Sequence, residues 1–209
     1  MKARVFVTGI STEVGKTLAS AILTEALEAD YWKPIQSGDL QYTDSDKVRE
    51  LITNTTSQIH PSAYSLQTPM SPHAAAEIDG VTIALDKIIP PQTKNHLVIE
   101  GAGGLMVPLN KQDTIADLIL DSYRVVVVSR HYLGSINHTL LTLQALKEMG
   151  FEPVIVFSGN PHPTTESIIA SKSQVPILGR IPELSEINSK AVYSLAEELR
   201  PALVRYLLT

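Results

Sequence analysis

The sequence contains no cysteine, which excludes disulfides, a thiol nucleophile and a cysteine-ligated zinc site. It also has no surplus of basic charge, because 17 Lys and Arg stand against 22 Asp and Glu and the formal net charge is -5. The basic residues are scattered singly along the chain. Since binding to a phosphate backbone needs clustered Lys and Arg, we expect no nucleic-acid partner.

Long apolar runs are absent as well. No stretch reaches the roughly 18 consecutive apolar residues of a membrane-spanning helix, so we expect no membrane partner. The first residues, 1–7, enter an apolar strand too short for the core of a signal peptide. With 44% hydrophobic and 19% charged residues, the chain has the composition of a globular protein, and we expect one domain spanning residues 1–209 and a cytoplasmic location.

Short apolar runs alternate with longer amphipathic stretches. The runs are residues 5–7, 97–99, 125–128 and 154–157, with weaker candidates at 31–32 and 177–178. Helices are expected near 16–28, 45–53, 82–89, 114–121, 137–149, 164–173 and 190–208. Continuous β-branched runs suit strands that are covered on both faces, so the pattern predicts an α/β fold with a doubly wound, mainly parallel sheet and helices on both faces. Ligands of such sheets bind at the carboxyl ends of the strands.

A glycine-rich segment follows the first run and leads into the first helix. Gly9 and Gly15 enclose five residues, one more than in the standard phosphate-binding motif, and Lys16 and Thr17 follow. Backbone amides and the helix N-terminus would hold phosphate, Lys16 would reach the β and γ oxygens, and the Thr17 hydroxyl would hold Mg²⁺. This predicts a P-loop NTPase-like fold; the alternative is a strand–turn–helix junction with a chance Gly-Lys-Thr.

Glu100 directly follows the run 97–99 and precedes Gly101, Ala102 and Gly103. A P-loop enzyme needs an acid at this place to hold Mg²⁺, and the glycines would let the backbone pass close to phosphate or substrate. We therefore expect Glu100 at a strand end, followed by a flexible loop. The alternative is a tight turn with a solvated glutamate.

Two further positions remain open on the residues alone. Asp46 is a candidate metal ligand, but the segment 44–46 is equally suited to capping the helix that follows. Lys33 ends the second strand and could stabilise charge on a transferring phosphoryl group, although a surface lysine before Pro34 explains the same pattern.

Four motifs together resemble the dethiobiotin synthetase family. They are Gly-Ile-Ser-Thr-Glu-Val-Gly-Lys-Thr at 9–17, Tyr-Trp-Lys-Pro-Ile-Gln-Ser-Gly at 31–38, Glu-Gly-Ala-Gly-Gly at 100–104 and Leu-Gly-Ser-Ile-Asn-His-Thr at 133–139. The same order and similar separations run from about residue 5 to residue 184. The family has the five-residue spacing in its phosphate loop.

The resemblance implies an ATP-dependent carboxylation and ring closure of 7,8-diaminononanoate with CO2, which yields dethiobiotin, ADP and phosphate through a phosphorylated carbamate. It implies catalytic roles for Lys16 and Lys33, and substrate contacts by Thr12, Lys33 and Ser37. Thr17, Asp46 and Glu100 would hold Mg²⁺. The implied nucleotide-binding residues are Glu13, Val14, Gly15, Lys16, Thr17, Leu18, Asp46, Glu100, Gly101, Ala102, Gly103, Asn160, Pro182, Glu183 and Leu184.

Gly134, Ser135 and Asn137 open a helix whose free amides could hold the substrate carboxylate. The resemblance implies that this happens across a homodimer interface, while the alternative is that Ser135 or Asn137 only caps the helix. Relatives often carry a lysine where this chain has Arg130, His131 and Tyr132. The residues do not define the preference for the nucleotide base.

Three rival functions share parts of this pattern. A nucleotide-switch ATPase of the partitioning type would need a basic patch or a membrane-targeting helix, and the C-terminal stretch 191–208 carries mixed charges instead. An amidating enzyme related to the cobyrinate amidases would need a glutaminase domain with a cysteine. A generic small-molecule kinase would differ from this pattern of motifs in only a few residues.

Overall fold

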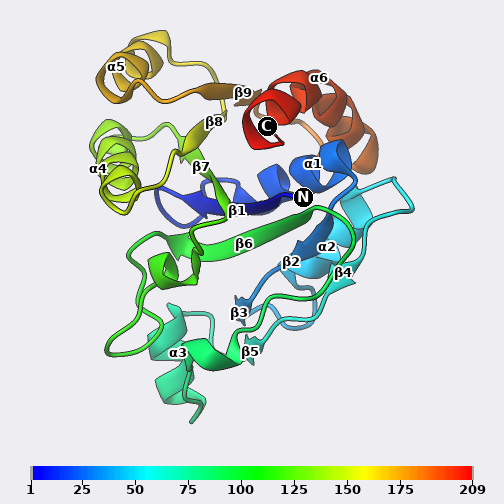
Figure 1. Ribbon diagram of the computed structural model, residues 1–209, viewed down its shortest axis with the longest axis vertical. Helices are drawn as coiled ribbons and strands as arrows, with labels where there is room; N and C mark the ends of the chain where they lie inside the picture. Colours follow the sequence, from blue (N-terminus) through cyan, green and yellow to red (C-terminus); the bar gives the residue numbers. More distant parts are fainter. Residues whose placement is uncertain (1, 209) are drawn as a thin grey trace.

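A parallel sheet runs through the centre of the computed structural model, which describes residues 2–208 (Figure 1). Its strand order is β4-β2-β6-β1-β7-β8-β9, and every neighbouring pair is parallel. The bounds are β1 (Arg4–Gly9), β2 (Asp30–Trp32), β4 (Ile59–His60), β6 (Leu97–Gly104), β7 (Arg124–Arg130), β8 (Val154–Ser158) and β9 (Ile177–Ile181). The chain starts in the middle of the sheet and builds outward in both directions.

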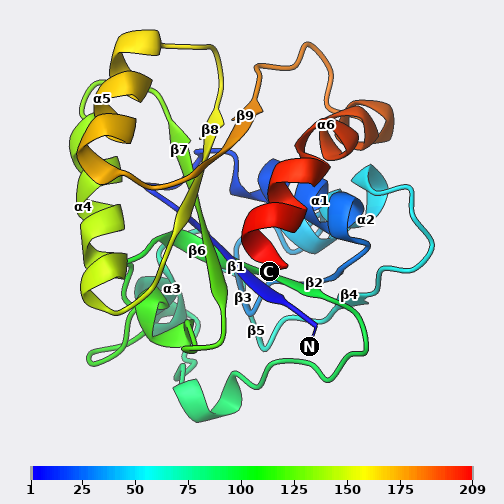
Figure 2. The same cartoon turned by 45° about the horizontal axis from the view of Figure 1, so that its top comes forward.

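Helices cover both faces of the sheet (Figure 2). On one face lie α1 (Lys16–Leu27), α2 (Asp44–Leu51) and α6 (Ser189–Leu207), and on the other lie α4 (Ser135–Glu148) and α5 (Pro163–Ser173). The central strands are buried along their length because both of their faces are covered. The predicted doubly wound α/β fold is confirmed. Among residues 2–208, no helix has the length and apolar character that crossing a membrane requires.

Three elements close to the site were not predicted. Strands β3 (Ile35–Ser37) and β5 (Tyr64–Leu66) form a small parallel pair, and α3 (Pro72–Ile78) packs against them. Three-residue strands are too short to show a period in the sequence. Helix α3 had a readable signal, because Pro72 occupies its first turn and three alanines follow.

Two predicted helices are only short 3₁₀ turns. The segment 82–89 contains η1 (Leu85–Lys87), and 114–121 contains η2 (Ile115–Leu118). Pro90 disfavours a helical conformation at the residue before it, which limits η1. The η2 segment begins with a capping box between Thr114 and Asp117, and its first amides bond the carbonyls of Val107 and Leu105.

Helices α1 and α2 are joined by a buried carboxylate. Glu25 of α1, which is 3% exposed, accepts hydrogen bonds from the amides and side chains of Thr53 and Asn54, just beyond the end of α2. Burial alone would raise the pKa of Glu25, but these hydrogen bonds outweigh it and the pKa is lowered. The charged carboxylate therefore fixes the C-terminal end of α2 on α1.

Candidate active site

The glycine-rich loop turns tightly between β1 and α1. Gly15 precedes α1 with φ 94°, in the left-handed region, and a Cβ at this position would lie 2.8 Å from Oγ of Ser158. Glu13 also adopts a positive φ of 55°. Both the conformation and the space at position 15 require glycine. The loop is thus shaped by backbone and presents the free amides at the start of α1 to the cleft.

Lys16 folds back over this loop. Its ammonium donates a hydrogen bond of 3.0 Å to the carbonyl of Ser11, and the residue is 7% exposed. Burial lowers the pKa of Lys16 to about 8; the nearby charge of Lys33 acts in the same direction and the carboxylate of Glu100 opposes it. The ammonium is therefore held next to the position predicted for phosphate, with little water around it.

Glu100 of β6 is the hub of the site. It is 1% exposed, and its Oε1 accepts hydrogen bonds from the Thr17 hydroxyl at 2.9 Å and the Lys33 ammonium at 3.1 Å. Its Oε2 accepts from the Tyr31 hydroxyl at 2.9 Å. Burial, followed by the charge of Glu100, keeps the pKa of Tyr31 well above its ordinary value, so the phenol stays a hydrogen-bond donor.

Lys33 lies between two carboxylates. Besides Glu100 it contacts Asp44, the first residue of α2, and Asp44 also pairs with Lys47 at 3.0 Å. Burial alone would lower the pKa of Lys33, but the charges of Glu100 and Asp44 outweigh it and raise the pKa. Burial would likewise raise the pKa of Asp44, and the charge of Lys33 lowers it. Lys33 is therefore a buried, charged side chain and not a surface lysine.

The position of Glu100 differs from the prediction. It does not end its strand, because β6 continues through the glycine-rich segment as far as Gly104 and pairs there with Gly9 of β1. A Cβ on Gly104 would lie 3.3 Å from the carbonyl oxygen of Gly9, so these glycines allow two backbones to run close together. The predicted flexible loop is wrong for residues 101–104.

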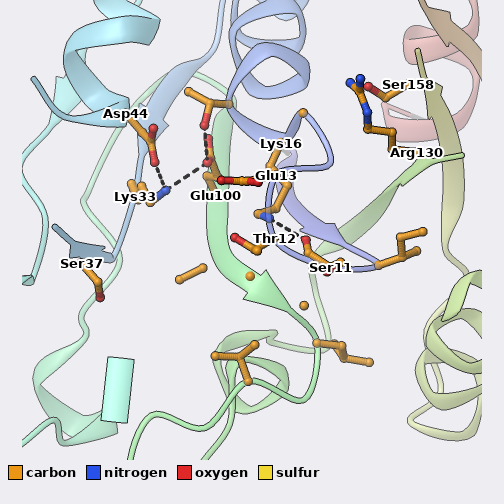
Figure 3. A pocket seen from close by; sticks show the side chains of 18 of the residues that line it. Ser11, Thr12, Glu13, Lys16, Lys33, Ser37, Asp44, Glu100, Arg130 and Ser158 are labelled. Carbon is orange, nitrogen blue, oxygen red and sulfur yellow. Dashed lines mark hydrogen bonds and ion pairs between the residues drawn. The ribbon is translucent and has the colours of Figure 1, made fainter. Parts of the chain in front are cut away.

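A cleft of about 1280 Å³ runs along the carboxyl ends of the strands (Figure 3). Lys33, Glu100 and the phosphate loop face it together. The predicted site residues on its wall are Thr12, Glu13, Gly15, Lys16, Thr17, Leu18, Lys33, Ser37, Glu100, Ala102, Gly103, Pro182, Glu183 and Leu184. Most of the predicted site thus converges on one cavity.

The structure keeps several predicted site residues off this wall. They are Val14, Asp46, Gly101, Gly134, Ser135, Asn137 and Asn160. Val14 is buried in the core, and Gly101 lies against Phe6 and Ile115 inside the sheet. Asn160 is exposed and directly follows Gly159, whose backbone lies beside the cleft residue Glu183.

The structure confirms the capping role considered for the segment 44–46. Thr43 is the N-cap of α2, and its amide and hydroxyl both donate to Oδ2 of Asp46, while the other oxygen of Asp46 pairs with the exposed Arg49. These bonds lower the pKa of Asp46 to about 2, with the Thr43 hydroxyl as the largest cause. The structure therefore brings Asp44, and not Asp46, together with Lys33 and Glu100.

At the start of α4, the alternative that Ser135 or Asn137 caps the helix is wrong. Its N-cap is Gly134, at φ 100°, and neither Ser135 nor Asn137 caps the helix. Ser135 is buried and its carbonyl accepts a bond from Thr139, whereas Asn137 is exposed. Farther along α4, Leu141 and Thr142 reach the cleft.

Sequence reasoning missed the apolar part of the cleft. It is formed by Met70 and Pro72 at the start of α3, Met106 and Val107 after β6, and Leu141 of α4. Met70 and Met106 are single exposed residues outside the helices and strands, and Leu141 is an exposed residue of α4, so only the fold brings them together. Arg130 and Ser158 were likewise missed as lining residues.

Oxygen donors suited to Mg²⁺ meet at Thr17 and Glu100. Hard cations prefer hydroxyl and carboxylate oxygens, and Mg²⁺ commonly takes only one or two carboxylates together with phosphate oxygens and water. Among residues 2–208, no three histidine or acidic side chains gather as a closed metal cage. An open site of a few oxygens beside a phosphate loop is the arrangement that fits here.

Comparison with known proteins gives consistent results over nearly the whole chain. A family model described as an AAA domain matches residues 3–191. The chain is 55% identical to the ATP-dependent dethiobiotin synthetase BioD of Christiangramia forsetii, over 95% of this chain and 96% of that protein. It is 49% identical to the protein of the same name from Cytophaga hutchinsonii, over 93% and 95%.

Solved structures with a similar fold are far more distant in sequence. A plasmid partition protein from Borrelia burgdorferi superposes with a TM-score of 0.61 at 14% identity, covering 98% of this chain and 99% of that one. A ParA family ATPase from Chlorobium tepidum gives 0.57 at 15% identity, covering 94% and 98%. At such identities the likeness concerns the fold.

The lowered pKa of Lys16 predicts that ATP binding is linked to proton uptake. With its pKa lowered to about 8, part of the Lys16 amines is uncharged at pH 8, and binding a triphosphate will favour the charged form, so a fraction of a proton will be taken up. The affinity for ATP will fall as the pH rises above 8. Titration calorimetry in two buffers of different ionisation enthalpy measures the uptake, and the Lys16→Met variant is the control. The interpretation fails if wild-type protein takes up no proton at pH 8.

Proposed function

We propose, from the premise that the chain belongs to the family of ATP-dependent dethiobiotin synthetases, that its cleft closes a cyclic urea on 7,8-diaminononanoate with CO2 and ATP. The observation that carries this proposal is the convergence of Lys16, Lys33 and Glu100 on one cavity. A buried cation beside a phosphate loop is what phosphoryl transfer to an anionic acceptor requires.

The proposed reaction has three steps. One amine of the substrate adds to CO2 and loses a proton, which gives a carbamate. A carbamate oxygen attacks the γ-phosphorus of ATP and ADP leaves, which gives a mixed anhydride. The second amine then attacks the carbamoyl carbon and loses a proton, inorganic phosphate leaves and the ring closes. Activation by phosphate is needed because a carbamate is a poor electrophile.

The two lysines divide the task of neutralising negative charge. Lys16 lies over the phosphate loop, next to the position of the β and γ phosphates, and Lys33 lies on the acceptor side beside β3. Asp44 and Glu100 hold Lys33 charged and in place before substrate arrives. Such preorganised charge needs no rearrangement when negative charge develops in the transition state.

Two hydroxyl side chains are suited to the acceptor end of the cleft. Within the described residues, the hydroxyl of Ser37 is buried without a hydrogen-bond partner, although the residue lines the cavity. A buried polar group without a partner is rare, and a substrate group would satisfy it. We assign Ser37 and Thr12 to substrate contact, and the apolar wall formed by Met70, Met106 and Leu141 to the aliphatic chain.

We assign Mg²⁺ to Thr17, Glu100 and an acid of α2. When bound, the ion would supply positive charge to the phosphate oxygens. Asp44 already carries two ammonium partners, Lys33 and Lys47, which compete with a cation. Within the described residues the side chain of Asp46 is bonded by Thr43 and by the exposed Arg49 and carries no buried ammonium, so we propose Asp46 as the third ligand, which would have to leave its cap.

The Asp46→Asn and Asp44→Asn variants distinguish which of these two acids of α2 is the third Mg²⁺ ligand. We expect Asp46→Asn to raise the Mg²⁺ concentration for half-maximal activity about 10- to 100-fold, because a metal-linked carboxylate is lost. Asp44→Asn should instead lower kcat, since it leaves Lys33 with one carboxylate fewer, and should change the Mg²⁺ requirement much less. Initial rates over a range of Mg²⁺ concentrations give both quantities. The reverse pattern would move the ligand to Asp44.

Substrate-dependent ATP hydrolysis tests the function itself. Hydrolysis should require both diaminononanoate and bicarbonate and should yield dethiobiotin, which mass spectrometry detects. A nucleotide switch, the function suggested by the partition-like fold, would hydrolyse ATP regardless of these compounds. Hydrolysis that ignores both compounds would therefore remove the proposed function.

Lys33→Gln tests the central residue of the proposal. We expect nucleotide binding to stay within a few-fold of the wild-type protein and kcat to fall by about 100-fold or more, as happens when one stabilising donor is removed. Lys47→Gln is the matched control, because it removes a more exposed lysine from the same Asp44. Steady-state rates and ATP binding are measured on each variant. Unchanged turnover in Lys33→Gln would take Lys33 out of the site.

We further propose a homodimer in which the start of α4 holds the substrate carboxylate across the interface. Hydrophobic side chains are exposed along this part of the chain: Leu133 is 104% exposed, and Ile136 and Leu141 of α4 are exposed as well. A cluster of this kind typically marks a protein–protein contact. Gly134, Ser135 and Asn137 lie off the cleft wall of their own chain, which suits a role toward the cleft of a second copy.

Leu133→Asp is expected to dissociate the dimer, because it places a charge in an apolar contact. The mass in solution, measured by light scattering after gel filtration, should halve, and the KM for diaminononanoate should rise. Val204→Asp is the control, since Val204 is 44% exposed on α6, far from α4. A wild-type protein that is monomeric at micromolar concentration contradicts this proposal.

A further inference from the structure

An ion pair at the end of the cleft opposite Lys33 has no role in the proposed chemistry. Arg130 is the last residue of β7, and its Nη2 donates to both carboxylate oxygens of Glu183, at 3.0 and 3.3 Å. Glu183 follows β9, so the pair joins the ends of two strands that flank β8. Both side chains line the cleft, and Figure 3 shows Arg130 beside Ser158.

The pair lies over the backbone of Gly159. A Cβ at this glycine would be 3.5 Å from the Glu183 carboxylate and 3.9 Å from Cζ of Arg130. Gly159 adopts φ 93°, in the left-handed region, and is followed by Asn160. Ser158, immediately before it, lies against Gly15 of the phosphate loop. Ser158 and the backbone of Gly159 therefore lie between Arg130 and the loop that would hold the phosphates of a nucleotide.

The backbone below the pair is fixed from the other side. The amide of Gly159 donates to the carbonyl of Ile181 at 2.8 Å, and its carbonyl accepts from Nη1 of Arg180 at 3.1 Å. Arg180 is in turn paired with Glu166 of α5. These two hydrogen bonds hold the backbone of Gly159 in place, so the Arg130 guanidinium beside it can keep one orientation.

The ion pair itself is a weak source of stability. The Arg130 and Glu183 side chains are 40% and 53% exposed, and exposed ion pairs contribute little to the free energy of unfolding. Its clearer effect is geometric, because it holds a guanidinium at a cleft wall. A guanidinium is a planar cation that stacks on aromatic rings, and nucleotide bases offer such a face.

We propose that Arg130 is a nucleotide-recognition residue whose guanidinium, oriented by Glu183, stacks on the base of the bound nucleotide. The inference rests on the proposed ATP binding in this cleft and adds the group that recognises the base. In this arrangement the phosphate loop binds the triphosphate, which all nucleotides share, and Arg130 contacts the part that differs between them.

The test compares Arg130→Ala, Arg130→Lys and Arg200→Ala in the full-length enzyme. Arg200 is the matched control, since it forms a similar exposed pair with Glu197 on α6, with 38% and 48% exposure, away from the cleft. For each variant the KM for ATP is measured, together with inhibition by inorganic tripolyphosphate, which has the phosphates but no base. Thermal unfolding of each variant reports on folding.

We expect Arg130→Ala to raise the KM for ATP about 3- to 30-fold, the range that a cation–π contact produces, while tripolyphosphate inhibition stays unchanged. Arg130→Lys should fall between Arg130→Ala and the wild type, because it keeps the charge and loses the plane. Arg200→Ala should match the wild type in both measurements.

Two outcomes would overturn the assignment. An unchanged KM for ATP in Arg130→Ala would mean that the pair is a surface ion pair without a role in binding. An equal loss of ATP and tripolyphosphate binding would mean that Arg130 acts on the phosphate loop and not on the base. Neither outcome bears on the proposed function, which fails only if the wild-type enzyme shows no hydrolysis dependent on diaminononanoate and bicarbonate.

Discussion

The buried contact between Glu100 and Lys33 is the constraint on which the site depends. A carboxylate that is 1% exposed is costly unless its charge and its oxygens are satisfied, and here an ammonium, a hydroxyl and a phenol satisfy them. These partners come from three places in the chain: Thr17 at the start of α1, Tyr31 on β2 and Lys33 just after β2. The cost of burying Glu100 alone thus fixes how β6, β2 and α1 meet, and that meeting forms the end of the cleft that contains Lys33.

The cleft consists of two halves with different construction. Its phosphate and acceptor half is made of buried charges in a shared network, in which removal of one member leaves another uncompensated. The half beyond Ser158 is more exposed and is built from backbone bonds and the pair of Arg130 with Glu183. Substitutions in the first half should affect several residues at once, whereas those in the second should act more independently.

The sequence predicted those parts of the site that follow directly from strand ends. Lys16 and Thr17 were readable because a glycine loop, a strand and a helix occur in fixed order, and the central strands because they are continuous apolar runs. The partner of Lys33 was not readable, since Asp44 and Asp46 are two residues apart and only the helix geometry decides which one faces the lysine. The continuation of β6 through its glycines was equally hidden, because it depends on the close approach of β1.

The hydrogen bonds of Glu25 attach the C-terminal end of α2 to α1, and the segment before α2 lies outside this contact. Because they fix the C-terminal end of α2 on α1, the stretch 38–43 that leads into α2 runs between two anchored elements. Changes of length in 39–42, ahead of the Thr43 cap, can therefore alter the shape of the acceptor end while α2 stays attached to α1. The architecture thus separates a segment whose length can vary from the helix that carries Asp44.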